Sequence, residues 1–221
     1  MKQKQGYFYF ISDEFYRLFD KEQRLMKNKE TIDGVLHGRP CFYAFEDNRT
    51  PGILWCVPVS SKLKKYEDIY AHKIERQREK GVERPMCNTI YFAEIMGIRR
   101  AFLIQNMFPI TNKYIASMYM DRNTQRPVTI EPGDERAIVS NARDVIRLVF
   151  GGNTRLVFSD IITTYKNLCA ELGQERESLT SETPAKKPSF IADIKQRQAE
   201  IAKRDRERKS GISNNKNEPD L

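Results

Sequence analysis

The chain has 221 residues, of which 31% are charged and 39% hydrophobic, and its net charge is +8 with a pI of about 9.3. This length suits one large domain or one domain with an appendage, and the apolar fraction is enough for a modest core. The positive balance favours polyanionic partners, because cations that meet phosphates release counterions, although a solvated basic surface would have the same composition.

The sequence lacks the motifs that are typical of several classes of protein. The four cysteines and two histidines do not have metal-site spacing, so no metal or other cofactor is expected. A P-loop, a dinucleotide fingerprint, a nucleophile elbow and a His-Glu-x-x-His motif are all missing. The sequence has no signal peptide and no membrane-length apolar run, so we expect a cytoplasmic protein with reduced cysteines and no membrane partner.

The first fifty residues predict strands around one helix. Gly6–Ser12 is rich in aromatic residues and is typical of a strand. Asp13–Asn28 has apolar residues at helical spacing, with Ser12 as its cap. Pro40–Glu46 predicts a second strand, and Asp47–Gly52 supplies the turn that follows.

A third strand and a long helix come next. Ile53–Val59 is apolar on both faces at its start, which predicts a central position in the sheet. Leu63–Lys80 has one apolar helical stripe, and Gly81 is placed to end that helix.

Two further strand-like runs, Thr89–Ile95 and Ala101–Ile110, predict a hairpin with Arg99 and Arg100 at its tip. Thr111 is expected to cap a short helix that runs through Met120.

The last part of the chain predicts two helices and a tail. Asp134–Phe150 and Asn153–Leu172 have helical spacing. From Gly173 the composition becomes charged, with Phe190 as the single aromatic residue, so we expect a domain over 1–172 and a tail over 173–221 that is flexible or folds on a partner. Within the tail, Ser189–Lys209 has a thin apolar stripe suited to a protein or membrane surface.

The segment from Pro58 onward has groups that bind phosphate. A buried strand leads to two hydroxyls and then to three lysines at the start of a helix. Hydroxyls, free backbone N–H groups and cations are what a phosphate needs. The alternative is that one serine only caps the helix and the lysines are solvated. The residues concerned are Ser60, Ser61, Lys62, Lys64 and Lys65.

Arg39 is the second candidate, because it stands at the entry to the Pro40–Glu46 strand. An arginine there can hold a phosphate with two hydrogen bonds. The alternative is a surface arginine beside a turn.

The order of these parts resembles the ToxN/AbiQ family, the toxins of type III toxin–antitoxin systems. The resemblance covers residues 7–120 well and 134–172 loosely. Two departures are the missing proline before Lys62 and Phe15, with Tyr16 next to it, where family members can carry tyrosine. The resemblance is carried by the aromatic N-terminal strand and helix, Arg39-Pro40, Pro58-Val59-Ser60-Ser61-Lys62 and Asn106-Met107-Phe108-Pro109-Ile110.

The resemblance implies an α+β fold with a small, strongly bent, barrel-like antiparallel sheet of the MazF/Kid kind and helices around it. It implies a metal-independent endoribonuclease that is inhibited by a small repeat RNA in a closed protein–RNA assembly, and that acts in phage defence by abortive infection. A non-catalytic RNA-binding module on the same fold is the alternative.

Metal-free RNA cleavage uses the 2′-OH of the substrate as nucleophile and leaves a cyclic phosphate. The enzyme must take up a proton, stabilise negative charge and align the reacting groups. Arg39 and Lys62 are expected to stabilise the charge, and Ser61 and Ser60 to hold a phosphate oxygen or orient the 2′-OH. No general base is evident. His72, on the predicted Leu63–Lys80 helix, is expected to be a partly exposed helix residue, and the alternative is that it reaches the site. The expected RNA contacts are phosphate contacts from Lys64, Lys65, Arg99 and Arg100, and base stacking by Tyr43, Phe15 and Tyr16, for which core packing is the alternative.

Overall fold

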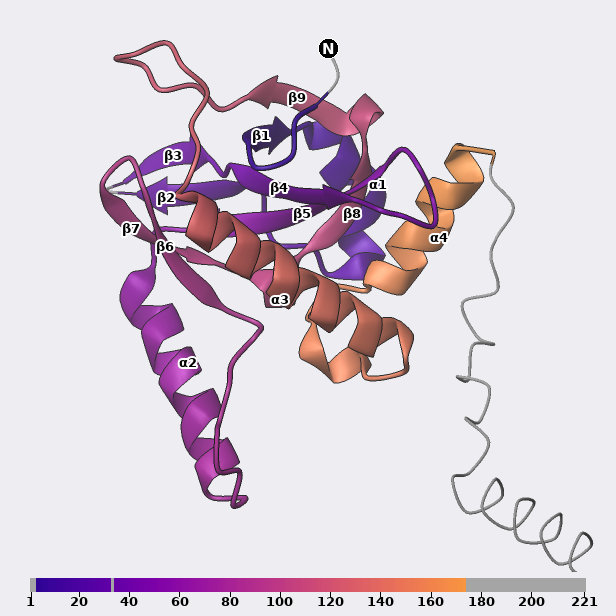
Figure 1. Cartoon of the computed structure of the whole chain (residues 1–221). Helices are drawn as coiled ribbons and strands as arrows, with labels where there is room; N and C mark the ends of the chain where they lie inside the picture. Colours follow the sequence, from indigo (N-terminus) through magenta and orange to yellow (C-terminus); the bar gives the residue numbers. More distant parts are fainter. Residues whose placement is uncertain (1–2, 33, 174–221) are drawn as a thin grey trace, which may run out of the picture. The chain divides into compact units, whose positions relative to one another are not determined.

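The computed structural model describes residues 3–32 and 34–173 (Figure 1). The predicted tail lies outside these residues from 174 onward, and its predicted helix stays a prediction. The α-helices are Asp13–Gln23 (α1), Leu63–Arg78 (α2), Pro132–Phe150 (α3) and Ile161–Glu171 (α4). The strands are Phe8–Ile11 (β1), Lys29–Ile32 (β2), Val35–Gly38 (β3), Cys41–Glu46 (β4), Ile53–Ser60 (β5), Tyr91–Ile95 (β6), Ile98–Phe102 (β7), Phe108–Thr111 (β8) and Ile115–Met118 (β9).

β5 is the centre of the main sheet, as its apolar sequence predicted, and all eight of its residues are buried. The sheet is antiparallel, with the strand order β6-β7-β5-β4-β1-β9. One edge of β5 pairs first with β8, over Ile53–Cys56, and then with β7, at Val59 and Ser60. β5 therefore has a different neighbour on this edge at each of its ends.

The expected barrel-like closure is not present. The strand order of the main sheet ends at β6 on one side and at β9 on the other. A closed barrel requires the outermost strands to pair with each other. Among the described residues β6 pairs with β7 and β9 pairs with β1, so the antiparallel sheet is open.

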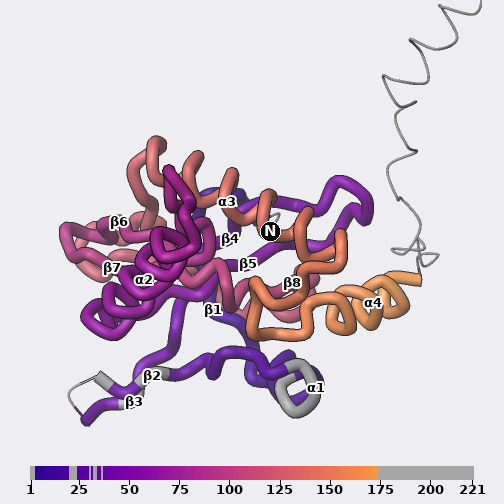
Figure 2. Tube along the Cα trace, turned by 90° about the horizontal axis from the view of Figure 1, so that it is seen from below, coloured from indigo at the N-terminus to yellow at the C-terminus, as the bar shows by residue number. Residues whose placement is uncertain are grey.

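Helices cover both faces of the sheet. α3 packs on β4 through a stripe of buried residues, and α4 packs on β8. Figures 1 and 2 place α3 and α1 on opposite faces of the sheet. On the α1 side, Phe15 stacks on Phe108 with ring centroids 5.3 Å apart, which joins the helix to β8.

The predicted helix over Asp13–Asn28 is shorter than expected. It ends at Gln23, because Arg24 adopts a left-handed backbone conformation with φ 52°. The chain then forms the β2–β3 hairpin, which was not predicted and which is a separate two-stranded sheet. Ile32 pairs with Val35 across Asp33-Gly34, an Asp-Gly dipeptide of the kind that favours tight hairpins.

The predicted β6–β7 hairpin is confirmed, but its tip lies elsewhere. Met96 and Gly97 form the turn, with φ values of 52° and 74°, and Ile95 pairs with Ile98. Two successive positive φ angles are the geometry of the tight turns that match strand twist. Arg99 and Arg100 therefore lie within β7, not at the tip.

Three other expectations were wrong in part. The Ala101–Ile110 run is divided between β7 and β8 by a short 3-10 helix at Ile104–Asn106. The helix predicted from Thr111 to Met120 is mainly β9, because pairing with β1 overrides local preference. The last helix begins only at Ile161, where the Asp160 carboxylate accepts a hydrogen bond from the Thr163 N–H at 3.0 Å.

Candidate functional site

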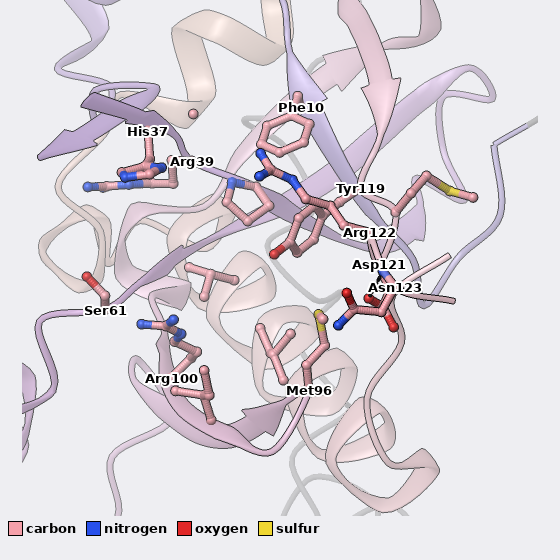
Figure 3. Close-up of a pocket in the computed structure, with 16 residues that line it drawn as sticks. Phe10, His37, Arg39, Ser61, Met96, Arg100, Tyr119, Asp121, Arg122 and Asn123 are labelled. Atoms are coloured by element: carbon pink, nitrogen blue, oxygen red, sulfur yellow. Dashed lines mark hydrogen bonds between the residues drawn. The ribbon is translucent and has the colours of Figure 1, made fainter. Parts of the chain in front are cut away.

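A cavity of about 580 Å³ is lined by residues from both margins of the main sheet, at or next to β6 and β9 (Figure 3). Its walls come from the β6–β7 hairpin, from the ends of β3 and β5, from β1 and from the segment after β9. The lining residues are Phe10, His37, Gly38, Arg39, Pro40, Val59, Ser61, Ile95, Met96, Ile98, Arg100, Tyr119, Met120, Asp121, Arg122 and Asn123.

The cavity is basic. Its lining includes three arginines, Arg39, Arg100 and Arg122, and a single acidic residue, Asp121. The Asp121 carboxylate accepts hydrogen bonds from the Thr124 hydroxyl at 2.7 Å and from the Asn123 N–H at 2.9 Å, and these bonds lower its pKa. The arginines outnumber this carboxylate, so the cavity suits an anion such as a phosphodiester.

Arg39 is buried, with 8% of its surface exposed, in the link between β3 and β4. Its backbone N–H donates to the Asn28 carbonyl at 2.7 Å, which holds the link in place. Burial raises the pKa of the Cys41 thiol to about 12 and the pKa of the Tyr16 hydroxyl above its ordinary value. The positive charge of Arg39 opposes both shifts. Arg39 is thus a buried cation at the wall of the cavity.

The two serines at the end of β5 have different surroundings. Ser60 is 1% exposed, and its hydroxyl accepts a hydrogen bond from the Lys62 N–H at 3.3 Å. Ser61 lines the cavity. Figure 3 shows Ser61 on the same side as His37 and Arg39, with the guanidinium of Arg100 turned toward it.

The lysines at the start of α2 lie outside the cavity lining. Lys62 is the N-cap of α2 and is exposed. Lys64 forms an ion pair with Asp68 at 2.9 Å, and Lys65 lies over the ring of Tyr66 at 5.6 Å.

Arg99 and Arg100 point to opposite faces of β7, because side chains alternate along a strand. Arg100 lines the cavity. Arg99 forms an ion pair with Glu67 at 2.9 Å and lies over the Phe92 ring at 5.0 Å. Of the two arginines, only Arg100 belongs to this site.

The aromatic residues expected to stack on bases are in the core. Phe15 has no exposed surface, Tyr16 is 8% exposed and Tyr43 is 4% exposed. The cavity instead offers Phe10 and Tyr119, whose rings meet edge to face at 5.4 Å. Tyr119 was not predicted to be a site residue, because its segment was predicted to be helical.

His37 is the main residue that sequence reasoning did not place in the site. It lies on β3, is exposed, and lines the cavity beside Arg39 (Figure 3). His72, in contrast, lies on α2 away from this lining. The signal for His37 was the Asp33-Gly34 dipeptide, which predicts the hairpin that brings it to the site.

Within residues 3–32 and 34–173, no three or more His, Cys, Asp or Glu side chains gather closely enough to hold a metal ion. In the same part of the chain, no helix combines the length and the apolar character needed to cross a membrane.

The fold of this chain is similar to that of an endoribonuclease from a toxin–antitoxin system. The chain aligns with AbiQ, described as a lactococcal anti-phage endoribonuclease belonging to the type III toxin–antitoxin system, with a TM-score of 0.53. The alignment covers 77% of this chain and 100% of the AbiQ chain at 11% sequence identity, which establishes a common fold. No protein-family model and no curated protein matches the sequence.

Proposed function

We propose that this protein is an endoribonuclease toxin of a type III toxin–antitoxin system. The observation that carries the proposal is the convergence of Arg39, Ser61, Arg100 and His37 on one basic cavity, in a fold shared with AbiQ. These side chains come from three separate segments, and together they supply cations, a hydroxyl and an imidazole, which are the groups that RNA cleavage requires.

The proposed reaction begins with the scissile phosphate between Arg39 and Arg100. The 2′-OH attacks the adjacent phosphorus and transfers its proton to the neutral imidazole of His37. The two guanidiniums stabilise the charge that develops on the phosphate oxygens. The Ser61 hydroxyl donates a hydrogen bond to one of these oxygens. The bond from phosphorus to the 5′-oxygen then breaks, and that oxygen takes a proton from water. The imidazolium of His37 returns its proton to the solvent. The products are a 2′,3′-cyclic phosphate and a 5′-hydroxyl, and the reaction needs no metal.

Other residues have supporting roles in this proposal. Phe10 and Tyr119 offer aromatic surface for a base next to the scissile phosphate. The exposed Lys62, Lys64 and Lys65, which follow directly after Ser61, contact phosphates outside the cavity. Ser60 acts through its hydrogen bond to the Lys62 backbone, which fixes the start of α2.

The biological part of the proposal is inhibition by RNA. A small repeat RNA occupies the basic cavity and keeps the enzyme inactive in a closed protein–RNA assembly within the cytoplasm, until phage infection releases the toxin. Light scattering on the complex copurified with its RNA measures the stoichiometry. A tandem repeat directly upstream of the gene would identify the antitoxin.

The direct test is incubation of the purified protein with a mixed RNA pool in EDTA. We expect discrete fragments with cyclic-phosphate ends, and a strong loss of these fragments with Ser61→Ala or Arg39→Ala. Intact RNA together with steeply salt-dependent binding would instead support the non-catalytic RNA-binding module.

A further inference from the structure

A second basic cavity, of about 400 Å³, lies between α2, α3 and the short helix at Thr154–Leu156. It has no lining residue in common with the Arg39 cavity. Four of its lining residues are cations, namely Lys73, Arg76, Lys80 and Arg155, and none is acidic. Such a concentration of one sign of charge favours an anionic ligand.

The spacing along α2 explains why the positive charges gather. Lys73 and Arg76 are three residues apart on α2, so they lie on one face of the helix. Lys80 follows in the turn after α2, where its N–H donates to the Gln77 carbonyl at 3.2 Å. The acidic residues of α2 are engaged elsewhere. Glu75 pairs with Arg78 at 3.3 Å and Glu67 pairs with Arg99 at 2.9 Å.

Lys73 is fixed in this cavity. Its ammonium donates to the Thr89 hydroxyl at 2.6 Å and to the Gln105 side-chain oxygen at 2.7 Å. Partial burial lowers its pKa, which a bound anion would reverse. An ammonium has three N–H groups, and the third has no acceptor among the described residues.

The other three cations are exposed and available. Arg76, Lys80 and Arg155 form no ion pair within the part of the chain that the structure describes. Next to them the cavity has an apolar wall that includes Leu148, 46% exposed, and Met86, 64% exposed. Cations beside apolar surface match a nucleotide, which joins a phosphate to a base.

We propose that this cavity is a second RNA-binding site, which holds the phosphates and a base of a single strand away from the cleavage site. The inference rests on the proposed function, because it takes RNA as the ligand. It assigns a role in RNA affinity, and none in RNA cleavage, to four residues: Lys73, Arg76, Lys80 and Arg155.

The test compares two triple variants in which exposed cations become glutamine. One is Arg76→Gln/Lys80→Gln/Arg155→Gln. The matched control, Arg17→Gln/Arg78→Gln/Arg147→Gln, removes the same charge from residues that line neither of the two cavities. Binding of a fluorescein-labelled single-stranded oligoribonucleotide is followed by anisotropy across salt concentrations, in EDTA, with Ser61→Ala as the background. Circular dichroism confirms that each variant is folded.

We expect the cavity variant to bind more weakly, with a slope of log affinity against log salt that is shallower by about 2 units, since each single-strand phosphate contact contributes roughly 0.7. The control should keep the wild-type slope. Equal slopes in the two variants would overturn the inference. Complete competition by adenosine monophosphate, at concentrations that leave binding at the Arg39 cavity unchanged, would also overturn it, because the site would then take a free nucleotide.

Cleavage separates this inference from the proposed function. With Ser61 intact, the cavity variant should cleave a dinucleotide substrate at the wild-type rate. If the wild-type protein cleaved no RNA but the cavity variant still had the shallower slope, the enzyme proposal would fail and the second site would stand. If the wild-type protein cleaved RNA but the cavity variant and the control variant had equal slopes, the enzyme proposal would stand and the second site would fail.

Discussion

Ser60 and Ser61 are neighbours at the end of β5, yet only Ser61 lines the basic cavity, while the hydroxyl of Ser60 is buried against the backbone of Lys62. Ser61→Ala should therefore reduce RNA cleavage by about 10²- to 10³-fold, the loss typical of removing one donor to a developing oxyanion. Fragment formation measured by gel gives the rate. Growth of cells that express the variant should be normal.

Ser60→Ala is the matched control for this prediction. It should lower the free energy of unfolding by about 1 kcal/mol, through loss of one hydrogen bond, and leave most cleavage intact. If Ser60→Ala stopped cleavage and Ser61→Ala did not, the assignment of the two hydroxyls would be reversed.

Arg100 and Arg99 provide a second adjacent pair on opposite faces of one strand. Arg100→Ala removes a cation from the cavity, and we expect cleavage to fall by about 10²-fold. Arg99→Ala breaks an exposed ion pair with Glu67, which is worth at most about 1 kcal/mol, so cleavage should stay near the wild-type rate. Single-turnover kinetics on one RNA substrate compares the two, and equal losses would contradict the placement.

His37→Ala should lower the cleavage rate by about 10²- to 10⁴-fold, as expected for loss of a general base. Added imidazole should restore part of the rate, because it can enter the space that the side chain leaves. His72→Ala, on α2, is the control and should have neither effect. Absence of rescue together with an unchanged rate would remove His37 from the mechanism.

Phe15 should act through the core and not through RNA. Its ring is fully buried against Phe108, so Phe15→Leu is expected to reduce the free energy of unfolding by about 1 kcal/mol and leave RNA affinity unchanged. Urea unfolding and anisotropy on the same sample measure the two effects. A large loss of affinity in a stable protein would restore the stacking role.

Alkaline pH should destabilise the protein. Burial raises the pKa of the Cys41 thiol and of the Tyr43 hydroxyl to about 12. In an unfolded chain these groups ionise near pH 8.5 and pH 10, respectively. Between those values and about 12 the unfolded chain releases protons that the folded chain keeps, so unfolding becomes easier as pH rises. Tyr43→Phe should flatten the decline of the urea midpoint above about pH 10, and an unchanged decline would contradict this assignment.

Much of the sheet could be predicted because its strands have strong local signals. Ile53–Val59 is apolar on both faces at its start, and that pattern favours a central strand. β9 had no such signal, since it is a strand through its pairing with β1, more than a hundred residues earlier in the chain. The β2–β3 hairpin was missed because Lys29–Ile32 is mostly polar and does not have the apolar alternation of a typical strand.

Site residues could be predicted where a side chain of suitable chemistry also lies on a segment that reaches the cavity. Arg39 and Ser61 were chosen as phosphate ligands from residue type and position, and the fold brings both to one cavity. The lysines of α2 have equally suitable chemistry, but the helix directs them away from the cavity lining. Which side of a strand or helix faces a cavity depends on contacts between distant segments, and those are not encoded in local spacing.

The open margin of the sheet has a consequence for how a substrate would enter. β6 and β9 are not hydrogen-bonded to each other, yet residues next to both of them line the Arg39 cavity. A closed barrel would fill this space with its own side chains and admit little more than a small ligand. An open margin lets a long polynucleotide be laid in from the side at any internal position, without threading an end. That mode of access is what distinguishes cutting within an RNA from trimming it.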